Sequence, residues 1–385
     1  MSTNGFSTKL QPLLPEIRAR REEIELGRRL PADLVDALTA SGVFGLAVPR
    51  ALGGDELDPL DQTRIIETIS GADGSTGWCV MIALGDGIFA GCMPEPGAKE
   101  IFTEPFRPTA ASIAPAGSAV EVDGGLCVSG RWRFASGIDH SDWLMAGCLL
   151  MDGSGPRITA AGTPEIVHVF MPKENTRVID TWFVSGLCGT GSSDFEASDV
   201  FVPEHRIVSL FEATRHRPEP LYQIPLLSLF APHVAAVGLG IARAALDELL
   251  ELAAEKTPTF SNVRIAEKPV TQVEIARAEC SLGAARAFLY DALDDLWQAV
   301  TAGREPTLRQ RAMCRMSAIK ASETAAQVTR TASTLAGGTS VYSSSALQRH
   351  TRDADAITHH VSQSPQMWEE CGRVLAGLDP LFPIF

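Results

Sequence analysis

The spacing of apolar residues changes twice along this chain of 385 residues, and this change constrains the fold more than any other feature. Residues 1–107 and 216–385 carry apolar side chains at steps of three and four, which is typical of amphipathic helices. Residues 108–215 instead alternate apolar and polar side chains, as strands do. A doubly wound sheet would alternate strand and helix throughout the chain. The order therefore predicts an α+β protein with three regions: helical, β and helical.

In the first region we expect several helices separated by short loops. Ser7 or Thr8 is a candidate N-cap for a first helix that continues through Ile17, Ile24 and Leu30. Pro31 suits the first turn of a second helix. The apolar patterns at 59–70 and 76–93 predict two more helices.

The middle region reads as a β domain. Gly124-Gly125 separates two alternating segments and predicts a hairpin, because glycine readily adopts the positive φ of a two-residue turn. Four further strands are expected, over 143–150, 166–171, 177–184 and 195–202.

In the third region, alanine-rich helical patterns of unusual length return. An amphipathic pattern runs from Val234 to Leu252, and two more long helices are expected over 269–302 and 306–335. Helices of this length are typical of a four-helix bundle.

Composition excludes several classes of protein. A formal net charge of −14 opposes a nucleic-acid partner or an anionic membrane surface. The first residues have no basic segment followed by an apolar one, and no stretch of 18 or more apolar residues predicts a membrane span. The eight cysteines are scattered without a CxxC pair, so we expect free thiols and no metal site. These features predict a cytoplasmic protein.

Three short segments are candidates for ligand contacts. Gly186–Ser193, GLCGTGSS, is either a simple turn or a place where backbone N–H groups approach a flat or anionic ligand. Residues 129–143 concentrate aromatic side chains around Ser136, which is either core packing or a hydroxyl presented to a ring system. The pair His359-His360 falls in a helical pattern, so at most one of the two rings would face a site.

Five segments in order resemble the acyl-CoA dehydrogenase superfamily, and in particular the oxygenase components of two-component flavin-dependent monooxygenases. The segments are LPADLVDALTASGVFGLAVPRALGG, GADGSTGW, SGRWRFASGIDHSDW, WFVSGLCGTGSSDFEASDVFVPEHR and LQRHTRDADAITHH. The resemblance covers nearly the whole chain. It implies an N-terminal helical domain (1–107), a central β-barrel or sandwich domain (108–215) and a C-terminal four-helix bundle (216–385) that assembles into a homotetramer.

The resemblance also implies a mechanism with reduced FMN or FAD from a separate flavin reductase, O2, and a C4a-hydroperoxyflavin that hydroxylates a small aromatic substrate. His360 would be the catalytic histidine after the motif Arg352-Asp353-Ala354, acting on substrate or peroxide, and Ser136 would lie nearest flavin N5. Arg264 would meet the flavin phosphate, which its forked donors fit. The other implied flavin contacts are Trp78, Ala111, Ser112, Ile113, Phe134, Ala135, Gly338, Thr339 and Val361.

One position departs from the resemblance. Several aromatic hydroxylases of this branch have a histidine about eight residues after the STGW tryptophan, where this chain has Asp86. An ionised carboxylate only accepts hydrogen bonds, so Asp86 would favour an ammonium group and N-hydroxylation of an amine. The alternative is a surface or capping residue.

Two further functions stay open. The residues after Arg352-Asp353-Ala354 contain no glutamate of the kind that acyl-CoA dehydrogenases use as a base, which disfavours FAD-dependent desaturation without excluding a base elsewhere. The second is a flavin-binding subunit without turnover.

Overall fold

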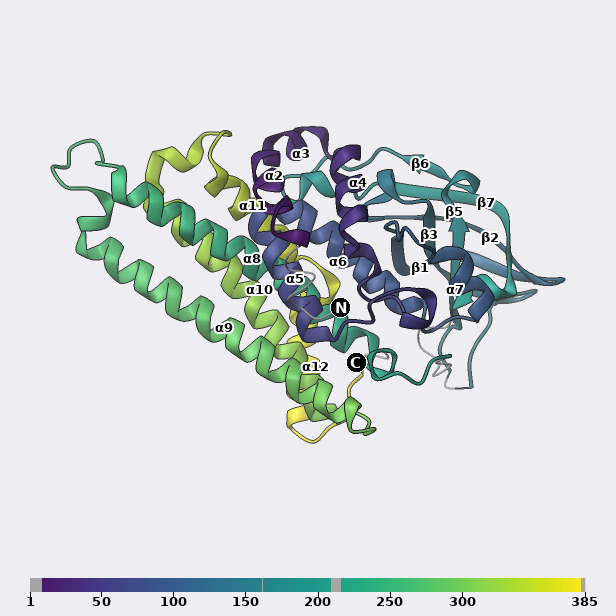
Figure 1. Ribbon diagram of the computed structural model, residues 1–385. Coiled ribbons are helices and arrows are strands. Elements are labelled where there is room, and N and C mark those ends of the chain that lie inside the picture. The colour runs from purple at the N-terminus through teal and green to yellow at the C-terminus, as the bar shows by residue number, and fades with distance from the viewer. Residues whose placement is uncertain (1–8, 161, 209–215, 382–384) are drawn as a thin grey trace.

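The computed structural model describes residues 9–160, 162–208, 216–381 and 385, and it has the three regions in the predicted order (Figure 1). The helices of the first region are α2 (Leu13–Ala19), α3 (Arg21–Gly27), α4 (Ala32–Ser41), α5 (Pro59–Ala72), α6 (Gly74–Phe89) and α7 (Glu95–Ile101).

The first expected helix is wrong in its extent. It is divided into α2 and α3 at Arg20, whose ψ of 7° leaves the helical range. Helix α3 ends at Gly27, because the next residue, Arg28, has a left-handed φ of 54°. Leu30 therefore lies beyond it, although Ile17, Ile24 and Leu30 are all buried. Pro31 precedes α4 as its N-cap residue, and Ser7 and Thr8 lie outside the described residues.

The middle region forms one sheet of eight strands in the order β6-β7-β2-β1-β3-β5-β8, with β4 paired to β3. Among the described residues β6 and β8 do not pair with each other, so the sheet does not close into the expected barrel. The hairpin between β1 and β2 turns at Asp123-Gly124, one residue earlier than expected, and only Gly124 has positive φ there, at 75°. Expected strand 177–184 is short, because β6 ends at Ile179. The strands are β1 (Ala110–Val122), β2 (Gly125–Trp132), β3 (Trp143–Asp152), β4 (Gly155–Pro156), β5 (Ile166–Pro172), β6 (Arg177–Ile179), β7 (Asp194–Pro203) and β8 (Ile207–Val208).

Trp132 organises the core of this sheet. Its ring stacks on Phe195 with centroids 5.0 Å apart, and its Nε1–H donates to the Gly147 carbonyl at 2.7 Å. A Cβ at Gly117 would lie 2.1 Å from the Trp132 ring, so glycine is required where the strands pass over the indole.

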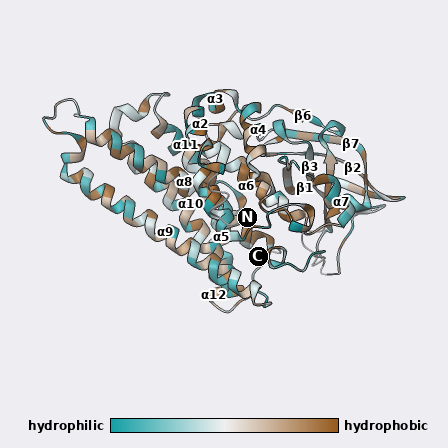
Figure 2. Cartoon of the chain, viewed as in Figure 1, coloured by the Kyte–Doolittle hydropathy of each residue, from teal (hydrophilic) through white to brown (hydrophobic). Residues whose placement is uncertain are grey.

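The third region holds α8 (Leu226–Glu255), α9 (Pro269–Thr301), α10 (Leu308–Ala336), α11 (Ala346–Thr358) and α12 (Pro365–Leu375). Hydrophobic and hydrophilic residues are interspersed along α9, because only one face of this helix is buried (Figure 2). By length and composition alone, helix α8 could cross a membrane, but 94% of its most apolar window is buried inside the protein. It is thus a core helix of the bundle.

The first and third regions share one hydrophobic core. Ile66 of α5, Val80 of α6, Ile241 of α8 and Ile357 of α11 belong to the same buried cluster. Helices α5 and α6 accordingly lie between the bundle and the sheet (Figure 1). The predicted boundary at 107/108 falls between α7 and β1, and the one at 215/216 falls where residues 209–215 are not described.

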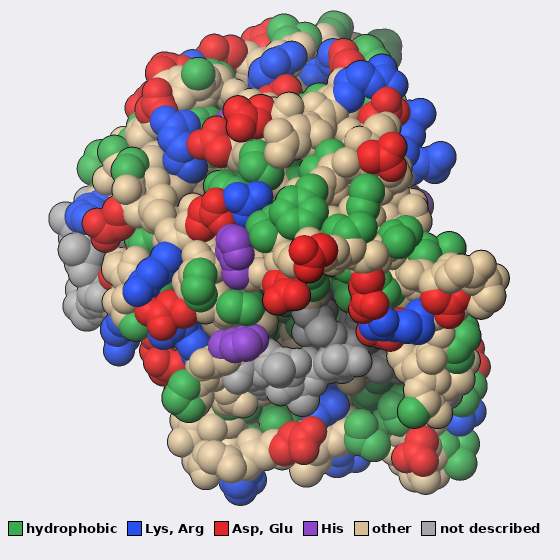
Figure 3. All heavy atoms as spheres, turned by 90° about the vertical axis from the view of Figure 1, so that its right-hand side faces the viewer, with side chains coloured by type: hydrophobic (Ala, Val, Ile, Leu, Met, Phe, Trp, Pro, Cys, Tyr) green, Lys and Arg blue, Asp and Glu red, His purple; other side chains and the backbone are tan. Residues whose placement is uncertain are grey.

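Acidic and basic side chains are interspersed on the face seen in Figure 3, with no broad basic area. Within the described residues, no group of three or more His, Cys, Asp or Glu side chains is placed to hold a metal ion. All eight cysteines are free.

Candidate active site

Trp78 is held at the junction of the three regions by the start of α6. The Asp73 carboxylate caps this helix by accepting from the Thr76 backbone N–H at 2.7 Å and its hydroxyl at 2.8 Å. Gly77 lets α6 approach α5, because a Cβ there would lie 1.9 Å from Ser70 Oγ. These contacts direct the Trp78 indole toward the sheet, where its Nε1–H donates to Ser136 Oγ at 3.0 Å.

Two loops of the sheet domain present Ser136. The Ala135 N–H donates to the Ser193 carbonyl at 3.2 Å, and the Gly137 N–H donates to the Thr190 carbonyl at 2.8 Å. Phe134, with a left-handed φ of 63° and a side chain that is 66% exposed, stands at the edge of this arrangement. The loops therefore place the ring of Phe134, which lies outside the core, near the buried hydroxyl of Ser136.

His360 reaches the same junction from the third region. The expected helical position is wrong, because α11 ends at Thr358 and His360 has extended backbone angles, φ −67° and ψ 141°. Its ring lies 5.6 Å, centroid to centroid, from both Trp78 and Phe230. His359 points into solvent, so one ring of the pair faces the site, as expected, but for a different reason.

The protonation of His360 follows from its surroundings. Burial lowers its pKa to about 4, so the ring is neutral at neutral pH. The Ser362 backbone N–H donates to Nδ1 at 3.2 Å, which makes Nδ1 an acceptor and leaves the proton on Nε2. His360 thus offers an N–H donor rather than a base at Nε2. We call Trp78, Ser136 and His360 the junction cluster.

Asp86 lies farther along α6 and is buried, so it is neither a surface residue nor a helix cap. Its Oδ2 accepts from Thr109 Oγ1 at 2.7 Å, directly before β1. Burial raises its pKa to about 7, although the Thr109 hydrogen bond opposes this. Near neutral pH a carboxyl with this pKa is partly protonated, and its protonated form can donate a hydrogen bond as well as accept one.

The start of β1 carries three of the expected flavin contacts. Ala111, Ser112 and Ile113 follow Thr109, and the Ile113 carbonyl is bonded to His168 Nε2 at 3.0 Å. This strand end and Asp86 lie together at the edge of α6. Val361 follows His360 and is 63% exposed.

Three expected contacts lie elsewhere in this chain. Arg264 follows α8 and pairs with Glu267 at 2.9 Å, and Thr339 accepts from Lys256 Nζ at 2.6 Å beside Gly338. Phe230 contacts His360 near the start of α8, and residue 255 lies about 37 Å farther along the helix axis. We call the end of the bundle that holds Lys256, Phe260, Arg264, Gly338 and Thr339 the distal end. Within this chain, the distal end therefore lies far from the junction cluster.

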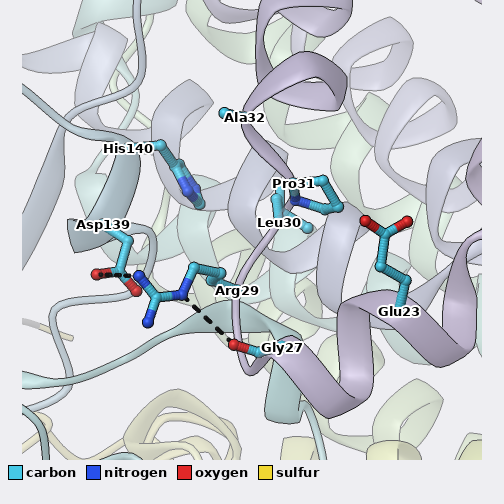
Figure 4. Close-up of a pocket in the computed structure, with 8 residues that line it drawn as sticks. All are labelled: Glu23, Gly27, Arg29, Leu30, Pro31, Ala32, Asp139 and His140. Carbon is cyan, nitrogen blue, oxygen red and sulfur yellow. Dashed lines mark hydrogen bonds and ion pairs between the residues drawn. The ribbon is translucent and has the colours of Figure 1, made fainter.

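A surface hollow of about 320 Å³ lies on the outer side of the Ser136 loop (Figure 4). Arg29 lies there between the Asp139 carboxylate, at 3.5 Å, and the Gly27 carbonyl, at 3.4 Å. Both ring nitrogens of His140 lack a hydrogen-bond partner within the described part of the chain. The lining includes no residue of the junction cluster, so this mixed-charge hollow is separate from it.

Sequence reasoning missed three contributors to the site. Thr190 and Ser192 lie in the glycine-rich segment Gly186–Ser193, but no role was predicted for their side chains, although the three hydroxyl residues of GTGSS were a usable signal. Phe230 carries no signal, because an aromatic residue in an apolar helix is most often core.

Two family models match most of the helical residues. Acyl-CoA dehydrogenase, N-terminal domain, matches residues 12–101, and acyl-CoA dehydrogenase, C-terminal domain, matches residues 233–365.

Full-length relatives are also similar. Indole-3-acetate monooxygenase of Pseudomonas putida is 33% identical over 94% of this chain and 92% of its own length. The flavin-dependent monooxygenase oxygenase subunit HsaA of Rhodococcus jostii is 30% identical over 93% of this chain and 94% of its own. The structure of XiaF from Streptomyces sp., in complex with FADH2 and glycerol, has a TM-score of 0.90, 25% identity and coverage of 100% and 98% of the two chains.

Proposed function

The chain belongs to the acyl-CoA dehydrogenase superfamily and to its flavin-dependent monooxygenases, and from this premise we propose that it is an oxygenase component acting on a small aromatic substrate. It uses reduced flavin, FMN or FAD, which a separate flavin reductase supplies, together with O2. The junction cluster carries this proposal, because it joins an indole, a hydroxyl and a neutral imidazole at one buried place.

The residues present fit a flavin. Trp78 and Phe134 offer aromatic surface to the ring system, and Ser136 offers a buried hydroxyl at its edge. Ala111, Ser112 and Ile113 supply an adjacent strand end. When bound, the reduced flavin supplies the electrons with which O2 is activated and one oxygen atom is transferred to the substrate.

The protein's own groups perform the remaining tasks. Ser136 and Trp78 orient the ring edge, and burial of both excludes water from it. The Nε2–H of His360 donates a hydrogen bond at the reacting oxygen or at a substrate oxygen. Asp86, with a pKa of about 7, holds a polar group of the substrate as donor or acceptor.

The distal end supports assembly as a homotetramer. Phe260 is fully exposed and has a left-handed φ of 64°, and Val341 and Tyr342 are also exposed. A large exposed aromatic ring on such a loop is typical of an interaction surface. In a tetramer, the distal end of one subunit brings Arg264, Gly338 and Thr339 to the flavin of another. A cytoplasmic location, with free thiols and access to the reductase, completes the proposal.

Isotope transfer tests the reaction. The purified protein is mixed with a flavin reductase, NADH, flavin and indole-3-acetate or simple phenols under ¹⁸O2. We expect one labelled oxygen atom in the product and none without reduced flavin. Failure of both FMN and FAD to bind in either redox state contradicts the proposal, as does anaerobic bleaching of bound FAD by butyryl-CoA, which would indicate a desaturase.

A further inference from the structure

Three hydroxyls behind Trp78 form a continuous hydrogen-bonded chain. Ser136 Oγ lies 2.7 Å from Ser192 Oγ, which lies 2.7 Å from Thr190 Oγ1. Thr190 Oγ1 donates to the Leu187 carbonyl at 2.8 Å. Ser136, Ser192 and Thr190 are at most 5% exposed, so water does not compete for these bonds. We call these three residues the hydroxyl chain.

The two ends of the hydroxyl chain determine its direction. A carbonyl only accepts, so Thr190 uses its proton on Leu187 and must accept from Ser192. Ser192, having donated its proton to Thr190, then accepts from Ser136. The hydroxyl proton of Ser136 is therefore also held in a hydrogen bond. Since the Trp78 indole N–H also donates to Ser136 Oγ, the Ser136 oxygen has one lone pair left and no proton to give.

From this geometry we infer that Ser192 and Thr190 are positioning residues that hold Ser136 as a hydrogen-bond acceptor and so make the site selective for reduced over oxidised flavin. The inference rests on the proposed function and on the position of flavin N5 beside Ser136 that the family resemblance implies. N5 carries a hydrogen in the reduced ring and a bare lone pair in the oxidised ring. The Ser136 oxygen can therefore accept a hydrogen bond from the N5–H of reduced flavin. In oxidised flavin, the lone pair of N5 would instead face the lone pair of the Ser136 oxygen.

Binding of oxidised flavin requires all three hydroxyls to turn. Ser136 would then donate to N5, Ser192 to Ser136 and Thr190 to Ser192, and the bond from the Thr190 hydroxyl to Leu187 would be lost. The Leu187 carbonyl would keep the Thr190 backbone N–H at 3.1 Å and the Trp182 indole N–H at 3.2 Å. The cost is thus close to one neutral hydrogen bond, which corresponds to a preference of about fivefold for reduced flavin.

Flavin affinity in the two redox states tests this inference without turnover. The dissociation constants of oxidised FMN and FAD, and of both after photoreduction under argon, are measured for the wild type and for Ser192→Ala. Without Ser192, the Ser136 hydroxyl can turn toward either ring, so we expect the ratio of the oxidised to the reduced constant to fall about fivefold. The midpoint potential of the bound flavin should fall with it.

Three further variants test whether the change in the ratio comes from the direction of the hydroxyl chain or from lost packing. Thr190→Val should reproduce the fall, because it removes the fixed end of the hydroxyl chain, and Thr190→Ser should restore the wild-type ratio. Ser193→Ala, a buried neighbour outside the hydroxyl chain, should leave the ratio unchanged. An unchanged ratio in both Ser192→Ala and Thr190→Val, with both flavin states still bound, overturns the inference. Absence of flavin binding by the wild type overturns the proposed function instead.

Discussion

Asp86 shows how burial changes the chemistry that a residue type suggests. As an aspartate it indicated a carboxylate that pairs with an ammonium group. Buried beside Thr109, with its pKa raised to about 7, it is as much a hydrogen-bond donor as an acceptor at neutral pH. This property favours a neutral or anionic polar group on the substrate over an amine.

Substitution of Asp86 by Asn should make stability less dependent on pH. The pKa of this carboxyl is about three units higher in the folded chain, so the free energy of unfolding of the wild type should fall by about 4 kcal/mol, relative to Asp86→Asn, as the pH rises from below 3.8 to above 7. The direction follows because the unfolded state loses this proton first. Urea unfolding of the wild type and of Asp86→Asn at several pH values measures the difference.

His360 is expected to affect the use of oxygen more than the binding of flavin. Removal of the Nε2–H donor in His360→Ala should lower the product formed per O2 consumed by about fivefold, the value of one neutral hydrogen bond made at the reacting oxygen. His360→Gln, which keeps an N–H donor, should recover part of the yield. Because the pKa of His360 is about 4, the yield should not titrate with this residue between about pH 5.5 and 8. Wild-type yield in His360→Ala would remove the histidine from the reaction.

At the scale of elements, an ion-pair network sets the position of α11, and with it that of His360. Glu25 of α3 accepts hydrogen bonds from Arg349 and Arg352 of α11. Burial alone would raise the pKa of Glu25, but the bonds from Arg352 and Arg349 hold it below its usual value. A further bond runs from the Leu187 N–H to the Asp353 carboxylate at 2.6 Å. The network therefore ties the first region and the sheet domain to the helix that precedes His360.

Glu25→Gln should destabilise the protein by about 1 to 3 kcal/mol at pH 7, because the buried Arg349 and the half-buried Arg352 lose their charge partner. The lowered pKa means that the contribution of Glu25 is present above its unfolded pKa of 4.5 and is lost as the pH falls below it. Thermal unfolding at pH 7 and at pH 4 checks both statements. The exposed neighbour Glu22→Gln is the control, and equal losses in the two variants would contradict the role of the network.

At the scale of the whole molecule, the distal end and the junction cluster are too far apart within one chain to hold the same flavin. The tetramer proposed above would resolve this separation by bringing the two together from different subunits. A helical core shared by the first and third regions provides the rigid frame for such an assembly.

Sedimentation should therefore show a species of four 41.2 kDa chains. Phe260→Asp should weaken the assembly and reduced-flavin affinity together, because it replaces the exposed aromatic ring of the distal end with a charged carboxylate. Phe201→Asp, at an exposed aromatic residue of β7, should change neither. Tight flavin binding by a wild-type monomer would contradict the shared site.

Much of the architecture was predictable because helix and strand periods are local. The long helices α9 and α10 and the hairpin at Gly124 follow from residues close in sequence. The parallel pairing of β1 with β3 does not, because it joins segments separated by the whole of β2. The break at Arg20 was also unpredictable, since the buried positions Ile17 and Ile24 keep a helical spacing across it.

By itself, the sequence determined the order of the regions and the identity of Trp78, Ser136 and His360 as residues of interest, because these follow from local periods and from motifs. Only the tertiary structure decided that Ser192 and Thr190 orient Ser136, that Asp86 can be protonated and that Nε2 of His360 carries its proton. The physical reason is that hydrogen-bond direction and pKa depend on burial and on partners from distant parts of the chain, which no local pattern encodes.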